Sequence, residues 1–238
     1  VLFRSLFVLL LRKSRFFRVS EIPALWIQIA FLLKVAAGLF LGWIYYHHYR
    51  DKYTSDTIKF FDDSRLLFNT LRTHPRDFFR MFTGIGGNDP SLRHYYVDMQ
   101  AWLNKDVLFN DNKTIIRLNT FFRFFSCGYY NVHVVFINMI SFTGLFSLFL
   151  ALRTFLAGRR RLFFIAIFGT PSLLLWGSGL LKDGMMLFAL GVLLYSFTQL
   201  VNGVSKKKHL PVFLGSLYLL LFTKFYVILT VAPGLLAW

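Results

Sequence analysis

The chain has 238 residues, of which 56% are hydrophobic and 16% charged, and its mean hydropathy is +0.53. Soluble domains are about 45–50% apolar and about 25% charged, so this composition favours an integral membrane protein with several spans. The net charge is +16, but many basic residues flank apolar runs, as the positive-inside rule expects, and we predict no nucleic-acid partner. The single Cys127 excludes an intrachain disulfide and a cysteine-based zinc site.

Residues 1–23 form a basic, aromatic segment. It is interpreted either as a cytoplasmic interfacial helix or as the remnant of an upstream span. Because the chain begins at Val1 and stops at Trp238 inside an apolar run, we expect a fragment of a longer protein.

Residues 24–46 are the first predicted transmembrane helix, because at about 1.5 Å per residue they cross a core of about 30 Å. Trp43, Tyr45 and Tyr46 are typical of an aromatic belt at its far end. Lys34 lies near the middle of this span. A charge there is either functional or packed against a partner carbonyl.

Residues 47–128 are polar and hold nine of the eleven acidic residues. Amphipathic stretches around 56–71 and 114–125 predict helices, so we expect an extracytoplasmic loop domain that lies on the bilayer. Its Gly84–Pro90 stretch, GIGGNDP, is interpreted as a plain loop because no GK[ST] follows it.

Residues 129–238 are predicted to form a transmembrane bundle. Its expected spans are 129–152, 162–178, 185–201, 211–223 and a truncated 227–238. If the basic turns at 159–161 and 206–208 are cytoplasmic, the long loop, the Lys182–Asp183 turn and Lys224 all fall on the outer side. The prediction is therefore an all-α polytopic membrane protein with about five or six spans.

Charged groups that are predicted to share the outer side form the candidate site. A carboxylate there could take the proton from an attacking hydroxyl, and basic groups could hold phosphate. The catalytic candidates are Asp56, Asp62 and Asp63. The binding candidates are Lys182, Asp183, Lys224, Arg117 and Arg123.

Each group also has a structural interpretation. Lys59 and Asp63 stand at i,i+4 and Asp62 and Arg65 at i,i+3 of a predicted helix, which is the spacing of ordinary surface ion pairs. Asp56 and Asp183 could instead favour helix N-termini, and the two arginines could be interface anchors. The six histidines are scattered and predict no metal site. Asp62 and Asp63 could hold a divalent cation, but no pattern of further ligands supports such a site.

A family resemblance covers parts of both halves of the chain. Residues 170–195, TPSLLLWGSGLLKDGMMLFALGVLLY, place a Ser- and Gly-rich turn with Lys-Asp between two spans, and FTKFYVILTVAPGLLAW follows at 222–238. With the acids that follow the first span, this resembles GT-C-type glycosyltransferases and bacterial polysaccharide polymerases. The acids are not Asp-x-Asp, however, and the spans are fewer than in a complete member.

The resemblance implies a base among Asp56, Asp62 and Asp63 and phosphate contacts at Lys182 and Lys224. It implies a polyprenyl-phosphate-linked sugar donor, a glycan or lipid acceptor, and a place among membrane lipids in the bacterial inner membrane. Two alternatives remain at this point. One is a transporter or flippase subunit in which Lys34, Lys182 and Lys224 line a pathway, and the other is a non-catalytic scaffold.

Overall fold

A computed structural model describes residues 2–49, 54–102, 111–156 and 158–237, and this part of the chain is all-helical. Four of its helices are long and apolar enough to cross a membrane. They are α2 (Ala24–His47), α7 (Tyr130–Leu152), α10 (Lys182–Val201) and α11 (Lys206–Ala237). The shorter helices are α1 (Leu2–Lys13), α3 (Asp56–Thr73), α4 (Pro75–Thr83), α5 (Arg93–Val97), α6 (Asn112–Ser126), α8 (Arg160–Gly169) and α9 (Pro171–Trp176), with single 3₁₀ turns at Arg15–Phe17 and Pro90–Leu92.

The predicted third span is divided in two. Residues 162–178 correspond to α8 and α9, and neither is long enough to cross a membrane alone. The helix ends before Pro171, which has no N–H to donate and disfavours helical backbone at the preceding residue. Thr170 accordingly has the extended values φ −63° and ψ 118°.

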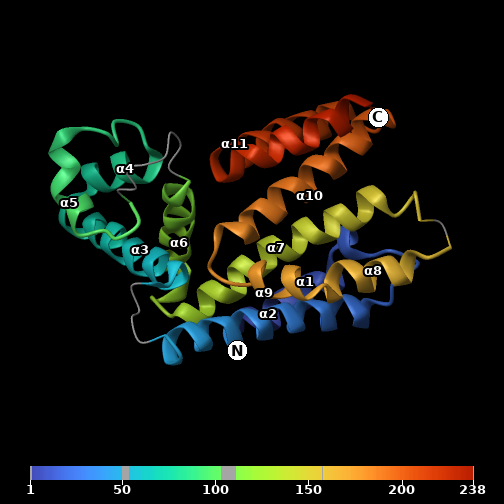
Figure 1. Ribbon diagram of the computed structural model, residues 1–238, viewed down its shortest axis with the longest axis horizontal. Helices are drawn as coiled ribbons and strands as arrows, with labels where there is room; N and C mark the ends of the chain where they lie inside the picture. Colours follow the sequence, from blue (N-terminus) through green and yellow to red (C-terminus); the bar gives the residue numbers. More distant parts are fainter. Residues whose placement is uncertain (1, 50–53, 103–110, 157, 238) are drawn as a thin grey trace.

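The last two predicted runs, 211–223 and 227–238, lie in the single element α11, except Trp238, which is outside the described residues. Within α11, Lys224 has the non-helical values φ −154° and ψ 82°. The C-terminus is marked in Figure 1 at the end of the view where α10 meets α11, so the chain turns back at Lys224.

The centre of the bundle is the close contact of α7 and α10. A Cβ added to Gly191 would lie 1.9 Å from the carbonyl oxygen of Gly144. Small residues allow two backbones to approach this closely, which is how apolar helices pack in the absence of water. The N-terminal segment packs on α2 and α7, because Phe7 of α1 contacts Phe31 of α2 and Phe136 of α7 edge to face.

The segment from α3 to α6, called here the α3–α6 segment, packs at one end of the bundle (Figure 1). Its core is continuous with the bundle, since buried Phe60 and Trp102 belong to the same cluster as Ile137 of α7 and Met185 of α10. At the opposite end Glu21 pairs with Arg153, at 3.4 Å, and with Arg160. These bonds join the N-terminal segment to the turn between α7 and α8.

Candidate functional site

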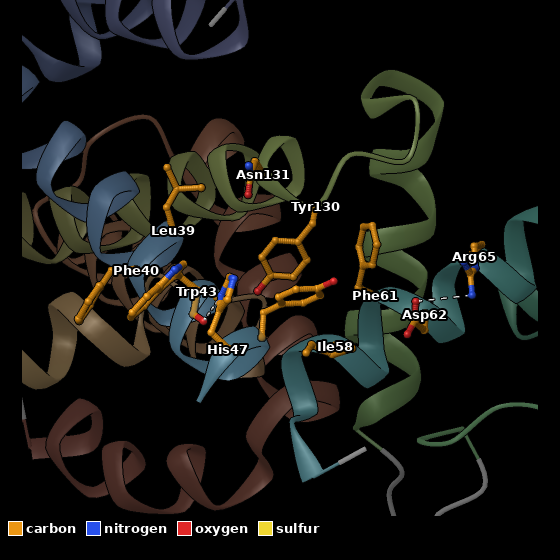
Figure 2. A pocket seen from close by; sticks show the side chains of 12 residues that line it. Leu39, Phe40, Trp43, His47, Ile58, Phe61, Asp62, Arg65, Tyr130 and Asn131 are labelled. Carbon is orange, nitrogen blue, oxygen red and sulfur yellow. Dashed lines mark hydrogen bonds and ion pairs between the residues drawn. The ribbon is translucent and has the colours of Figure 1, made fainter. Parts of the chain in front are cut away.

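A cavity of about 810 Å³ lies where α2 and α7 meet the α3–α6 segment (Figure 2). Its volume is in the range of small-molecule sites in proteins. The lining side chains come from α2, α3 and α7. They are Leu39, Phe40, Gly42, Trp43, Tyr46, His47, Ile58, Phe61, Asp62, Arg65, Tyr130 and Asn131.

One wall of the cavity is a row of stacked rings on α2. The Phe40 and Trp43 rings are stacked with centroids 6.1 Å apart, and the Trp43 and His47 rings are stacked at 5.3 Å. The three residues lie one turn apart on one helical face. All three rings belong to α2, an apolar helix of spanning length. Apolar surface therefore extends from the cavity along this helix.

The polar wall is formed by α3. Asp62 and Arg65 lie one turn apart, with 3.8 Å between a carboxylate oxygen and a guanidinium nitrogen. The Asp62 side chain is 35% exposed, so it is accessible within the cavity. Figure 2 shows this pair on the far side of Phe61 and Tyr130 from the α2 rings. Asp56 does not line this cavity and pairs with Lys59 at 3.9 Å, exposed to solvent.

Asp63 faces in a different direction and is buried. Its two carboxylate oxygens accept hydrogen bonds from the backbone N–H groups of Gln100 and Ala101, at 2.9 and 2.7 Å. Burial raises the pKa of this carboxyl above its ordinary value, and the two N–H bonds partly offset that rise. The geometry favours a structural role, in which Asp63 holds the backbone near residue 100 against α3.

A second polar cluster surrounds the start of α10. The Lys182 ammonium lies 2.7 Å from an Asp111 carboxylate oxygen and donates to Asn112 Oδ1 at 3.0 Å. Asp183 pairs with Lys224 at 3.4 Å, at the break in α11. Lys182 and Lys224, the two lysines predicted to bind phosphate, are therefore each already paired with a carboxylate.

The two polar groups lie at the same end of the bundle and are connected. Asn112 Nδ2 donates a hydrogen bond to the carbonyl oxygen of Ala101. The backbone N–H of Ala101 in turn donates to the Asp63 carboxylate. The Lys182 ammonium also lies 6.0 Å from the centroid of the Phe60 ring on α3. Asp63 and Phe60 of α3 are thus connected to the predicted turn at 182–183.

Arg117 and Arg123 bond internally. Arg117 Nε donates to the carbonyl of Met81 at 2.9 Å. Arg123 is 7% exposed and donates to Ser64 Oγ and to the carbonyl of Phe61, at 2.8 and 2.6 Å. Burial lowers the pKa of Arg123 to about 10, and Arg65 adds a smaller repulsion. Both side chains join α6 to neighbouring elements, a geometry that favours a structural role over phosphate binding.

Lys34 is fully buried in α2 and donates to the carbonyl of Gly177 and to Ser178 Oγ, each at 3.1 Å. Gly177 follows the end of α9, so the cation lies where a helix leaves unsatisfied carbonyls. This is the packing of a charge against a partner carbonyl, one of the two interpretations of Lys34 in the sequence analysis.

Some members of these clusters had no specific signal in the sequence. Asp111, Tyr130 and Asn131 belong to no motif that the sequence analysis identified, and Asn112 begins an Asn-Lys-Thr triplet, a pattern that occurs often by chance. The spacing of Phe40, Trp43 and His47 on one helical face was a usable signal. Within the described residues no group of three His, Cys, Asp or Glu side chains could hold a metal ion.

The fold and site define an all-helical chain with four helices of spanning length and an amphipathic cavity at one end of the bundle. No family model, curated protein or solved structure matches it.

Proposed function

We propose that this chain is part of an integral membrane glycosyltransferase or polysaccharide polymerase. It would use a sugar linked to a polyprenyl phosphate, at the outer face of a bacterial inner membrane. The observation that carries the proposal is the composition of the cavity. It joins the stacked rings and apolar surface of α2 to the Asp62–Arg65 pair of α3.

Each part of a lipid-linked sugar then has a partner. The lipid chain lies along the apolar face of α2, and the phosphate binds the Arg65 guanidinium, which is 61% exposed and held by a single long ion pair. The apolar face of the sugar packs on the Trp43 and His47 rings. Lys182 and Lys224 are less suitable for the phosphate, because it would have to displace Asp111 and Asp183.

Asp62 is the general base in this proposal. It accepts the proton of an acceptor hydroxyl while that oxygen attacks the anomeric carbon of the donor. The bond between the anomeric carbon and the phosphate oxygen breaks, and its electron pair leaves with the lipid phosphate. General-base assistance of this kind contributes about 10²–10⁴-fold to a rate.

The test uses the full chain in liposomes with undecaprenyl phosphate glucose as the probe donor and an oligosaccharide as the acceptor. Release of undecaprenyl phosphate is measured as the product. Asp62→Asn should lower the rate by about 10²-fold or more while the probe still binds, and Arg65→Gln should weaken binding of undecaprenyl phosphate relative to undecaprenol. The matched control is Asp56→Asn, which removes a charge from the same helix outside the cavity. Equal rates for wild type, Asp62→Asn and Asp56→Asn would refute the assignment, as would equal binding of the phosphate and the alcohol.

A further inference from the structure

A second cavity lies at the opposite end of the bundle from the proposed sugar site. It has a volume of about 610 Å³ and is lined by Glu21, Gly158, Arg159, Arg160, Arg161 and Leu162. Three of its six lining residues are arginines and one is acidic. Nothing in the proposed glycosyl transfer uses this cavity.

The positive charge around this cavity is only partly neutralised. The Glu21 carboxylate pairs with Arg160 and, at 3.4 Å, with Arg153. The backbone carbonyl of Glu21 accepts a hydrogen bond from Arg161 Nε at 3.2 Å. Arg159 is exposed and makes no ion pair within the described residues. One glutamate therefore faces four arginines, and the region keeps an excess of positive charge.

Unpaired donors at the start of α8 add to this positive charge. The Nε of Arg160 is buried and has no hydrogen-bond partner among the described residues. The same residue begins α8, whose N-terminus has no side-chain cap. Uncapped N–H groups and the positive end of the helix dipole favour a phosphate there.

An apolar groove lies one helical turn further along α8. It has a volume of about 310 Å³ and lies between α2 and α8. Leu162, which lines the arginine cavity, shares an exposed helical face with Ile165 and Gly169, which line the groove. The opposite wall of the groove comes from the start of α2. Its members there are Trp26, Ile29, Ala30 and Leu33.

We propose that this combined surface binds an anionic phospholipid of the surrounding membrane. The phosphate lies on Arg159 and Arg161 at the start of α8, and one acyl chain lies in the groove between α2 and α8. A cationic pocket that leads into an apolar groove complements a headgroup with an attached chain, whereas a soluble phosphate compound would leave the groove empty. The proposal requires that α2 lies in a membrane and is independent of the glycosyl transfer.

Trp26 provides a direct readout, because it lines the groove. The full chain is placed in phosphatidylcholine vesicles that contain either phosphatidylglycerol or phosphatidylcholine with brominated acyl chains, at equal mole fraction. The difference between wild type and Trp26→Phe isolates the fluorescence of Trp26. Brominated phosphatidylglycerol should quench Trp26 more strongly than brominated phosphatidylcholine.

Two variants separate headgroup recognition from chain binding. Arg159→Gln with Arg161→Gln should lower the relative affinity for phosphatidylglycerol by about five-fold for each arginine. The control, Lys206→Gln with Lys207→Gln, removes the same charge from the start of α11 and should keep the preference. Ile165→Phe narrows the groove and should reduce quenching by both brominated lipids.

If the double arginine variant melts below the wild type, Arg159→Gln alone is used, because Arg159 makes no ion pair within the described chain that its loss would break. Equal quenching of wild-type Trp26 by the two lipids would overturn the proposal. So would an equal loss of preference in the arginine and lysine variants, which would show general attraction to the membrane surface. Unchanged quenching in Ile165→Phe would overturn the placement of the acyl chain.

Discussion

The contact between Gly191 and Gly144 should control the stability of the bundle. A methyl group on Gly191 would lie 1.9 Å from the Gly144 carbonyl oxygen, and one on Gly144 would lie 2.3 Å from Phe188 Cα. These neighbours are backbone atoms and cannot rotate away. In Gly191→Ala the two helices must separate by about 1.5 Å to restore ordinary contact at 3.4 Å.

The expected cost is a loss of about 1–3 kcal/mol in the free energy of unfolding, typical of overpacking a close contact. The measurement is thermal unfolding of the purified chain in detergent, followed by circular dichroism. The matched control is Gly215→Ala in α11, where an added methyl group meets nothing within 4 Å. Because alanine favours helix by about 1 kcal/mol over glycine, this control should unfold at the wild-type temperature or slightly above it.

The same substitution should affect the polar cluster at the start of α10. A shift of α10 moves Lys182 relative to Asp111 and Asn112, which belong to the α3–α6 segment. Loss of stability should therefore be accompanied by faster proteolysis of that segment. If Gly191→Ala unfolds at the same temperature as Gly215→Ala, the close packing of α7 on α10 is refuted.

Two further predictions concern buried charges. Lys34→Met leaves the Gly177 carbonyl without its donor and should lower the free energy of unfolding by about 1–3 kcal/mol, measured from the melting curve. If Lys34 instead lined a transport pathway, the variant would lose ion uptake into liposomes while its stability stayed unchanged. The raised pKa of Asp63 means that its native state binds the proton more tightly than the unfolded state does. Its contribution to stability is therefore complete below the ordinary value of 3.8 and is lost as pH rises through the higher native pKa. The difference in melting temperature between wild type and Asp63→Asn should accordingly shrink as pH rises from that value, and a difference that stays constant would contradict the burial argument.

The sequence predicted the elements whose signal is local. The apolar runs at 24–46 and 129–152 correspond closely to α2 and α7, because an apolar run of this length without proline is a local signal for one spanning helix. The third run is divided at Thr170, and the local signal for this division is Pro171. Contacts such as Lys182 with Asn112 join residues 70 positions apart. Only the folded chain shows which of many polar residues pair over such separations.

The choice among the three acids of α3 illustrates the limit of sequence reasoning. Asp62 and Asp63 are adjacent, and a helix turns about 100° per residue, so their side chains leave α3 in different directions. Asp62 lines the cavity, whereas Asp63 accepts hydrogen bonds from the backbone N–H groups of Gln100 and Ala101. Composition and spacing treat the two acids alike, and the difference arises only from what packs on each face of the helix.

Because Asp62 and Asp63 lie in different environments, changing each to Asn should reduce turnover for different reasons. In Asp63→Asn the new side-chain amide turns an N–H toward a backbone N–H, which costs about 1–3 kcal/mol and acts through folding. Any loss of turnover in Asp63→Asn should therefore follow the fraction of folded protein and recover at lower temperature. Asp62→Asn leaves the backbone bonds intact, so its lost turnover should persist at every temperature at which the protein is folded. Recovery of Asp62→Asn on cooling would show that Asp62, too, acts through the fold, and the assignment of a general base in this cavity would have to be abandoned.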